Sequence, residues 1–420
     1  VKPPSLDEIA RRGVRFDRSY CQFALCSPSR SSFMTGLAPD KTTIYNLQKH
    51  FREAIPDAVT LGQVFQKNGY FSGRVGKIYH YGNPGDIGTN GLDDAPTWNE
   101  RINPKGVDKT EEPNVTNHTP ERKSLGSALA FYASPRPDEE HTDGMVAAES
   151  IRMMEKQGNN PWFIGAGFYR PHCPYIAPSK YFDRVPLDQV KAIPLQPGEM
   201  EIAPKWAYFT TPANWGMTER QAREAMQAYF ASILFLDAQV GKLLAALDRL
   251  RLRERTTVVF LSDHGYGLGD HGQWMKQTIF EYAARSPLMM CGAGVKSHGR
   301  ACGRTVEFLD IYPTLADLCG LDHVPKNLHG RSLRPLLNDP RARWDKPAVS
   351  QMQRQRVMGY SIRDERYRYS MWDGGKEGEE LYDYKTDPRE LKNLAKKPEA
   401  AAIQASLRKQ LDSITAARRS

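Results

Sequence analysis

The sequence predicts an α/β fold in which helices cover both faces of a mostly parallel sheet, with a smaller α+β subdomain at the C-terminal end. Apolar, β-branched segments such as 256–261 alternate with segments of helical period such as 219–250, and this alternation is typical of parallel sheets. From about residue 341 short strand-like segments follow one another, which indicates a small antiparallel sheet. We therefore expect a main α/β domain over 1–340 and a subdomain over 341–420.

The composition indicates an ordinary globular protein of 420 residues with a net charge of +9. No run of Lys and Arg is long enough to form a nucleic-acid arm, so we expect no nucleic-acid partner, although the positive charge suits an anionic substrate. The six cysteines form no C-x-x-C pair, which indicates neither a zinc site nor a dense disulfide scaffold. No apolar run reaches the length of a transmembrane helix, and we expect no membrane span.

The N-terminal half begins with a capping box, Ser5-Leu6-Asp7-Glu8, which predicts a helix that ends at Gly13. A strand over 14–20 then delivers the chain to a loop at Cys26. The segment 82–139 is rich in Gly, Pro, Asn and Asp, which predicts a long surface insertion. The other elements expected in this half are helices at 60–69 and 144–156 and strands at 70–75 and 162–167.

The C-terminal half continues with the long helix 219–250 and the strand 256–261, which ends at Ser262-Asp263-His264-Gly265. Polar residues at the carboxyl end of a strand mark the usual site of an α/β fold. The further elements expected here are a strand at 287–291, a helix at 306–319, a hairpin at 357–363 and 367–372, a strand at 380–383 and a closing helix at 398–416.

The most informative stretch is Cys26-Ser27-Pro28-Ser29-Arg30, which runs on to Thr35-Gly36. Ser27 suits an N-cap, Pro28 suits the first helical position, and Gly36 suits a left-handed helix end. The side chain at position 26 then lies at the positive end of a helix, where an anion is favoured, and Arg30 offers a fork of donors to a tetrahedral oxyanion. The alternative is that Cys26 forms a disulfide with Cys21 or is a buried thiol.

This stretch resembles the sulfatase signature, Cys-x-Pro-Ser-Arg with a Thr-Gly end. In that family a dedicated maturation enzyme oxidises the cysteine to formylglycine, an aldehyde whose hydrate attacks sulfur. The resemblance therefore implies formylglycine at position 26, a calcium ion and a fold of the alkaline-phosphatase type. It covers nearly the whole chain and is weakest across the two loop-rich regions.

Four basic side chains at predicted strand ends or in the loops that follow could bind the oxygens of a sulfate group: Lys77, His80, His172 and Lys276. Taken singly, each could instead be a solvated lysine or a structurally satisfied histidine. Asp263 is a candidate ligand for a hard cation such as calcium, although it could merely cap a turn.

Three segments are similar to the iduronate-2-sulfatase branch of the family: Asp263-His264, Gly76-Lys77-Ile78-Tyr79-His80 and Met358-Gly359-Tyr360-Ser361-Ile362-Arg363. The resemblance assigns roles by position. Cys26 as formylglycine is the nucleophile and a metal ligand, and Asp263 and His264 bind calcium. Arg30 and Lys77 hold the formylglycine and sulfate oxygens, and His80 takes a proton as sulfate is expelled. His172 and Lys276 bind the sulfate, and one of them assists the departing alcohol.

The resemblance also implies a first strand that ends in a paired Asp-Asp, which would supply two further metal ligands, and this strand is absent from the sequence. Position 1 is Val, and no signal-peptide pattern is visible. We expect the sequence to be an incomplete record of a longer, extracytoplasmic protein (periplasmic, secreted or lysosome-like) whose signal peptide is not visible for that reason.

The expected function is hydrolysis of a sulfate ester, specifically the 2-O-sulfate of a uronic acid in a sulfated saccharide. Arg354 and Arg356, just before the predicted hairpin, are the candidates for binding the uronate carboxylate, and the alternative is that they are solvated surface residues. Two other functions stay open. One is a phosphonate or phosphate monoester hydrolase of the same superfamily, and the other is an inactive glycan-binding paralogue.

Overall fold

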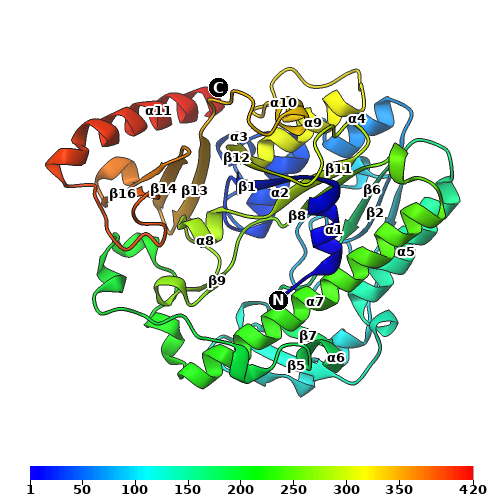
Figure 1. Ribbon diagram of the computed structural model, residues 1–420, viewed down its shortest axis with the longest axis horizontal. Coiled ribbons are helices and arrows are strands. Elements are labelled where there is room, and N and C mark those ends of the chain that lie inside the picture. The colour runs from blue at the N-terminus through cyan, green and yellow to red at the C-terminus, as the bar shows by residue number, and fades with distance from the viewer. Residues whose placement is uncertain (420) are drawn as a thin grey trace. The chain divides into compact units, whose positions relative to one another are not determined.

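A computed structural model describes residues 1–419 and divides the chain into two compact units (Figure 1). Unit 1 consists of Val1–Arg11, Thr60–Ile193 and Trp215–Thr256. Unit 2 consists of Arg12–Val59, Pro194–Asn214 and the chain from Thr257 onward. Each unit is therefore built from segments that are far apart in the sequence. The subdomain expected from residue 341 lies within unit 2, and its boundary stays a prediction.

Unit 1 contains a three-stranded parallel sheet in which β2 lies between β3 and β6. Helix α5 packs against β2 and β6, and Val75, Val146 and Met153 belong to the apolar core of this unit. The elements of unit 1 are the helices α1 (Pro4–Arg12), α4 (Leu61–Lys67), α5 (Thr142–Gln157), α6 (Ser179–Phe182) and α7 (Glu219–Arg249) and the strands β2 (Phe71–Gly76), β3 (Glu100–Ile102), β4 (Thr116–Asn117), β5 (Ala130–Ser134), β6 (Trp162–Gly167) and β7 (Tyr175–Pro178).

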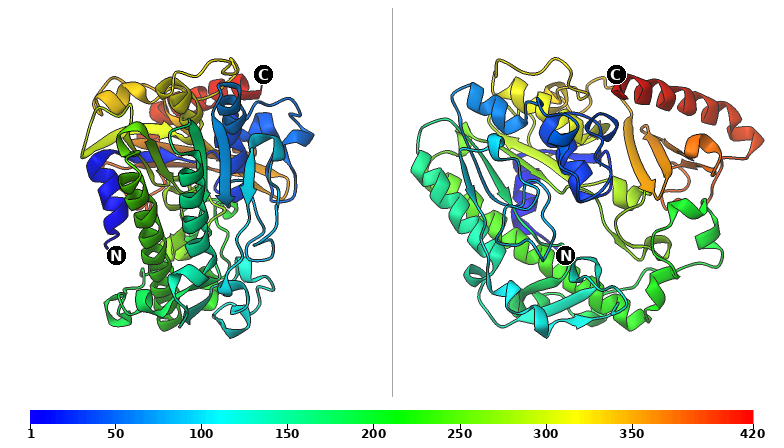
Figure 2. Two further views of the ribbon diagram at one scale, coloured as in Figure 1. Left: turned by 90° about the vertical axis from the view of Figure 1, so that its right-hand side faces the viewer. Right: turned by 180° about the vertical axis from the view of Figure 1, so that it is seen from behind.

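The region 82–139, expected as a surface insertion, contains three short strands, so it is partly structured. One of them, β5, pairs in parallel with β7 and antiparallel with β4, which gives unit 1 a second sheet. Helices α5 and α7 lie side by side (Figure 2), and α7 also packs against β7. The helices and strands expected over 60–75 and 144–167 are confirmed.

Helix α7 is long and apolar enough, by length and composition, to cross a membrane. The expectation that no run reaches this length is therefore wrong for this helix, although 61% of its most apolar window is buried inside the protein, as in the core helix of a globular protein. Asp237 of α7 accepts hydrogen bonds from the backbone N–H groups of Ser5 (3.2 Å) and Leu6 (2.8 Å). Helix α1 thus begins at Pro4, before the expected capping box, and its first amides are bound by Asp237.

Unit 2 contains a four-stranded sheet in the order β12-β1-β11-β8. β1 and β12 are parallel, but β11 runs antiparallel to both β1 and β8, so this sheet is mixed rather than mostly parallel. The elements of unit 2 are the helices α2 (Cys26–Thr35), α3 (Pro39–Thr42), α8 (Glu281–Ala284), α9 (Ile311–Leu318), α10 (Arg334–Asn338) and α11 (Ala401–Arg419) and the strands β1 (Gly13–Tyr20), β8 (Thr257–Leu261), β9 (Gly267–Leu268), β10 (Trp274–Met275), β11 (Leu288–Gly292), β12 (Arg300–Glu307), β13 (Ala348–Arg354), β14 (Val357–Arg363), β15 (Tyr367–Trp372) and β16 (Glu379–Asp383).

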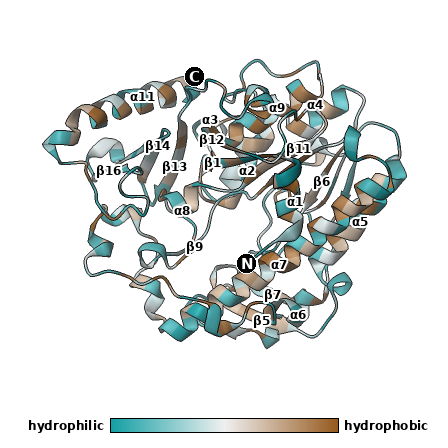
Figure 3. Cartoon of the chain, in the orientation of Figure 1, coloured by the Kyte–Doolittle hydropathy of each residue, from teal (hydrophilic) through white to brown (hydrophobic). Residues whose placement is uncertain are grey.

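The second sheet of unit 2 is antiparallel throughout, in the order β13-β14-β15-β16. Helix α11 mixes hydrophobic and hydrophilic residues along its length (Figure 3), and Leu407 and Leu411 on its buried side pack with Ile362 and Leu381 of this sheet. The hairpin, the third strand and the closing helix expected in this region are confirmed. Strand β13 was not expected, and it runs beside the Cys26 loop through a bridge between Phe23 and Gln351.

Candidate active site

Cys26 is the first residue of α2, and Leu25 is the N-cap. Ser27, the expected N-cap, is already helical, so that prediction is wrong. Pro28 is tolerated in this first turn because the amides there have no partner within the helix. Gly36 ends the helix with a φ of 72°, as expected. Cys26 therefore lies in the first helical turn, where the helix dipole still favours an anion.

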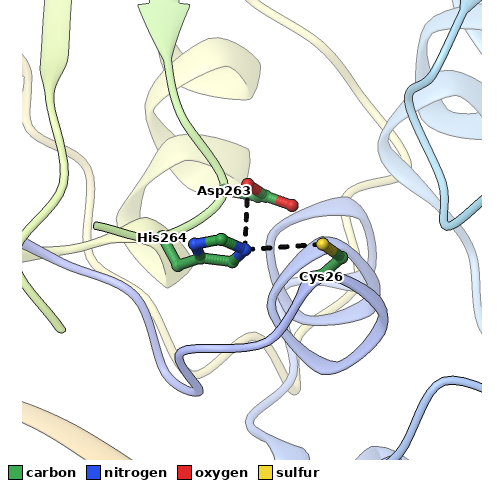
Figure 4. Close-up of side chains that lie close together, drawn as sticks. All are labelled: Cys26, Asp263 and His264. Carbon is green, nitrogen blue, oxygen red and sulfur yellow. Dashed lines mark hydrogen bonds and ion pairs between the residues drawn. The ribbon is translucent and has the colours of Figure 1, made fainter. Parts of the chain in front are cut away.

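The Cys26 side chain is 1% exposed and lies between two polar groups from other parts of unit 2. Its Sγ is 3.4 Å from Nε2 of His264 (Figure 4), and Nζ of Lys276 donates to Sγ at 3.0 Å. All six cysteines lie in the described residues and none is in a disulfide, so the alternative pairing with Cys21 is wrong. The thiol thus faces an imidazole and an ammonium group, as a reactive rather than a packing cysteine would.

Two residues of the signature hold the loop that follows β8. Nε of Arg30 pairs with Oδ2 of Asp263 at 2.8 Å, and the Ser29 hydroxyl donates to the backbone carbonyl of Asp263. In the same loop, Gly265 donates its backbone N–H to Ala283 at 2.8 Å. The start of α2 and the end of β8 are therefore fixed to each other by polar contacts.

The side chains of Cys26, Asp263 and His264 form a group that could hold a metal ion, since their ligand atoms lie within 4.8 Å of one another. Nδ1 of His264 is 2.8 Å from the carbonyl oxygen of Gly265. A proton on Nδ1 satisfies this contact and leaves the lone pair of Nε2 facing Cys26 and Asp263, which is the usual arrangement of a metal-ligating histidine. The donor set fits a divalent metal. Calcium takes six to eight oxygen ligands, and among these three side chains only Asp263 offers oxygen, so the group would supply only a small part of a calcium coordination shell.

Lys276 is 8% exposed and follows the β9–β10 hairpin. Its two neighbours, Met275 and Gln277, have positive φ values of 66° and 71°, which is unfavourable for side chains of this size and persists only when the surroundings enforce it. A contact with a distant segment of the chain supports this conformation, because the N–H of Gln277 donates to the carbonyl of Ala24 at 3.0 Å. This bond holds Lys276 against the residues that precede Cys26.

Arg354, at the end of β13, reaches the same loop. Its guanidinium donates to the side chain (3.3 Å) and the backbone carbonyl of Gln277 and lies 5.0 Å from the ring centre of Phe209. Within residues 1–419 it has no carboxylate partner, and its buried Nε makes no hydrogen bond. Burial lowers the pKa of the Arg354 guanidinium to about 10. Arg356, in the turn between β13 and β14, is exposed to solvent.

Unit 1 carries the other three candidate residues, described here within that unit. Lys77 and His80 follow β2 and are 2% and 7% exposed. Lys77 is therefore not the solvated lysine that the sequence left open, whereas burial does not separate the two readings of His80. The backbone N–H of Lys77 donates to Gly167 at the end of β6 at 2.7 Å. His172 lies in the turn after β6 and is half-buried.

The Nδ1 atom of His172 is engaged within its own turn. It lies 2.7 Å from the carbonyl oxygen of Cys173 and 3.0 Å from Nδ2 of Asn83, which also donates to that carbonyl at 2.6 Å. The shorter contact to a carbonyl places the proton on Nδ1. Nε2 would then be the ring nitrogen that can interact with a substrate.

Sequence reasoning missed several residues that shape the site. Ser29 was part of the signature but had no assigned role, and Asn83 and Gln277 gave no signal because their contacts join segments that are distant in the sequence. Lys276 and Arg354 were expected separately, and the contact of Arg354 with the residue after Lys276 became visible only in the fold.

A buried cysteine at a helix N-terminus, grouped with a carboxylate, an imidazole and a lysine, is an arrangement in an α/β protein that could bind an oxyanion. A profile of the family described as Sulfatase matches residues 2–321, and one described as N-sulphoglucosamine sulphohydrolase, C-terminal, matches residues 269–417. The first match covers well over half of the chain, and the chain therefore belongs to the sulfatase family. The expected enzyme class, a sulfuric ester hydrolase, is confirmed at the level of the family.

Similar proteins include iduronate 2-sulfatase from Mus musculus, 29% identical over 97% of this chain and 89% of the relative. Choline-sulfatase from Rhizobium meliloti is 31% identical over 96% of this chain and 80% of the relative. Among solved structures, the phosphonate monoester hydrolase of Agrobacterium radiobacter has a TM-score of 0.81 at 23% identity, covering 100% of this chain and 91% of that one. The expected similarity to iduronate-2-sulfatases and the alkaline-phosphatase-like fold class are thus confirmed.

Proposed function

We propose that this protein hydrolyses sulfate esters with formylglycine at position 26 and a calcium ion, and that its substrate is a saccharide carrying a 2-O-sulfated uronic acid. The observation that supports the chemistry most directly is the environment of Cys26. Its side chain lies at the start of α2 within reach of His264 and Lys276. Burying an imidazole and an ammonium group beside a thiol is unfavourable for packing alone, and it becomes favourable when an anion binds there.

The roles in unit 2 follow from the contacts of each side chain. Formylglycine would supply the attacking oxygen, and calcium held by Asp263, His264 and position 26 would offset the negative charge of the sulfate. Lys276 binds a sulfate oxygen, because its ammonium group already reaches the side chain at position 26. Arg30 orients Asp263 through their ion pair.

We further propose that Lys77, His80 and His172 also take part in the hydrolysis. Lys77 binds a sulfate oxygen, and His80 accepts a proton as sulfate is expelled. His172, as an imidazolium that carries a proton on each ring nitrogen, donates the Nε2 proton to the departing alcohol and is left with its proton on Nδ1. The near-complete burial of Lys77 supports a charged role, since a lysine is rarely buried unless it binds an anion or acceptor groups.

The first test is the chemical state of position 26. In protein produced together with a formylglycine-generating maturation enzyme, the peptide that spans position 26 should be about 18 Da lighter than its cysteine form, and the protein should cleave an aryl sulfate. Cys26→Ala should abolish turnover without loss of the fold, because the nucleophile is removed. Cys21→Ala, a change at another buried cysteine, is the matched control and should keep most of the activity. An active Cys26→Ala variant would refute the mechanism.

Removal of the metal provides a second test. Dialysis against a chelator should lower the activity, and added calcium should restore it. The thermal midpoint should rise with calcium concentration in the wild type and rise much less in Asp263→Asn, since a ligand that binds only the folded state stabilises it. Restoration by another divalent cation but not by calcium would contradict the proposed metal.

The saccharide part of the proposal is supported by Arg354. A buried guanidinium without a carboxylate partner is costly, and a carboxylate from the substrate would satisfy it bidentately. Its contacts with Gln277, the residue after Lys276, support a role for this cation near the proposed sulfate ligand. A cationic substrate such as the one named for choline-sulfatase would be repelled by this group. We expect the protein to act outside the cytoplasm, where such saccharides occur.

A phosphonate or phosphate monoester hydrolase is the second candidate, favoured by the likeness in fold to the phosphonate monoester hydrolase. Rates on aryl sulfate, aryl phosphate and aryl phosphonate separate the two functions. A preference for either phosphorus ester would replace the sulfatase proposal, and the absence of turnover on all three by formylglycine-bearing protein would support an inactive glycan-binding role.

A further inference from the structure

The turn that carries His172 is held by a buried carboxylate from another element of unit 1. Asp143 lies in the first turn of α5 and accepts hydrogen bonds from two successive backbone amides of the turn that carries His172. Its Oδ1 accepts from the N–H of Tyr169 and its Oδ2 from the N–H of Arg170, each at 2.8 Å. The start of the His172 turn is therefore fixed to the start of α5.

The buried Arg170 side chain donates hydrogen bonds to the rest of the turn. Its Nη1 donates to the carbonyl of His172 at 3.0 Å, and its Nε donates to the carbonyl of Ile176 at 2.8 Å. Its Nη2 pairs with Asp108 at 3.1 Å. The other oxygen of Asp108 accepts from the backbone N–H (2.8 Å) and the hydroxyl (2.7 Å) of Thr142, which is the first residue of α5. Both ends of the turn are thus connected to α5.

The charged groups that hold the turn are more deeply buried than the His172 side chain that the turn carries. Asp108, Asp143 and Arg170 are 4%, 2% and 5% exposed, whereas His172 is half-buried. Burying three charged groups to order one short turn is unfavourable unless the geometry of that turn matters. The ordered turn presents the imidazole of His172, whose Nδ1 already donates to the carbonyl of Cys173.

We propose that Asp143 and Arg170 are positioning residues of the hydrolase reaction, which fix the turn so that Nε2 of His172 meets the departing alcohol oxygen. This inference rests on the proposed function, in which His172 donates that proton. Misplacing a catalytic group by about 1 Å can lower a rate about 100-fold, so small shifts of this turn should be visible in kinetics. Burial raises the pKa of Asp143 to about 6, and the charge and hydrogen bonds of Arg170 and the N–H of Tyr169 limit this rise. Assays at about pH 7.5 therefore examine the ionised carboxylate.

The test is a double-mutant cycle between Asp143→Asn and His172→Ala. Asn can accept only one of the two amide hydrogens at this place, so Asp143→Asn should lower kcat/KM about 10–100-fold. The loss should be larger for an alkyl sulfate, whose departing alcohol needs a proton, than for an aryl sulfate with an acidic phenol. In the His172→Ala background the same substitution should cause little further loss, because the residue acts through His172.

Asp138→Asn is the matched control. Asp138 is also a buried carboxylate of unit 1, but it binds the side chains of Tyr181 and Gln239 rather than the turn, so its effect should be the same in both backgrounds and on both substrates. For Arg170, the conservative Arg170→Lys should keep more activity than Arg170→Met. Equal losses from Asp143→Asn with and without His172 would overturn the inference while leaving the proposed function intact. Full activity in His172→Ala would remove the role of His172 itself and the inference with it.

Discussion

Arg354 allows a prediction about specificity at the level of one residue. Its guanidinium is largely buried against Gln277 and Phe209, and it has no carboxylate partner among residues 1–419. If it binds a uronate carboxylate, Arg354→Gln should lower kcat/KM for a 2-O-sulfated uronide about 10–100-fold, because a charge-assisted bidentate contact contributes roughly 1.5–3 kcal/mol. Activity on a neutral aryl sulfate should change little.

Arg356→Gln is the control for this prediction. Arg356 is the next arginine along the chain but lies exposed in a turn, so its substitution should change neither rate by more than about twofold. Equal losses on both substrates in Arg354→Gln would indicate a structural role for Arg354. A larger loss of kcat/KM for the uronide in Arg356→Gln than in Arg354→Gln would indicate that the carboxylate binds in the turn at Arg356.

Single residues differ in how far the sequence could predict them. Cys26, Arg30 and Gly36 are predictable because their interactions or backbone conformations arise within one local segment. The burial of Lys77 was not predictable, because whether a lysine is solvated depends on elements that are remote in the sequence. Asp143 resembled an ordinary residue of a first helical turn, and its two bonds to the His172 turn connect residues 26 and 27 positions away.

At the level of elements, Gly265 joins the end of β8 to helix α8. A Cβ atom at this position would lie 2.1 Å from the carbonyl oxygen of Tyr282 and 2.3 Å from that of Arg285, which are backbone atoms that cannot move aside cheaply. Gly265→Ala should therefore displace the loop that carries Asp263 and lower stability by about 1–3 kcal/mol. Calorimetry with and without calcium checks both effects.

A glycine that lies in open space serves as the control for this substitution. No atom lies within 4 Å of the Cβ position at Gly69, although its φ is positive, so Gly69→Asn should have a smaller effect, since Asn tolerates this conformation. A Gly265→Ala variant with normal calcium binding would show that the loop position does not depend on this contact.

The prediction of elements failed where tertiary contacts override local pattern. In β12, charged residues occupy positions where a strand usually has apolar ones, so the sequence did not predict this strand. Its last residues were predicted as the start of the helix at 306–319. The strand forms by pairing in parallel with β1, and Glu307 at its end is buried and paired with Arg418 and Lys346, the first of them 111 residues away. By contrast, α4 was predictable because Thr60 and Gln63 form its capping box locally.

At the scale of the whole chain, Glu307 predicts how stability depends on pH. Burial opposes its ionisation, but Arg418 and Lys346 hold the pKa of Glu307 at about 2, below its ordinary value of 4.5. A lowered pKa contributes stability above the unfolded value that is lost as pH falls. Unfolding temperatures should therefore fall between about pH 4.5 and 2 in the wild type.

Glu307→Gln should be less stable than the wild type by about 3–5 kcal/mol at neutral pH, because it leaves Arg418 without its buried partner and Lys346 with Asp310 alone. Its stability should also change less over that acid range. Glu365→Gln removes an exposed ion pair with Arg304 and should have little effect at any pH. Parallel pH profiles for wild type and Glu307→Gln would contradict this account.

The alternation of strands and helices was enough to predict the class of the fold, since it reflects the covering of sheets by helices. The division into two compact units that each combine distant segments was not predictable, because nothing in the local pattern at residues 60, 194 or 257 indicates which unit a segment joins. The mixed direction of the first sheet in unit 2 escaped prediction for the same reason: strand direction is set by the connections, and not by the composition of β11.

The burial of Cys26 has a consequence for the order of events in biosynthesis. Residues 21–29 are all buried, so another enzyme could reach this segment only while it is extended. The oxidation that we propose for Cys26 must therefore precede folding, and a chain that folds first would be locked in its thiol form. The fraction of active protein should depend on a kinetic competition between chain collapse and oxidation, and should rise when synthesis is slowed at a constant level of the maturation enzyme.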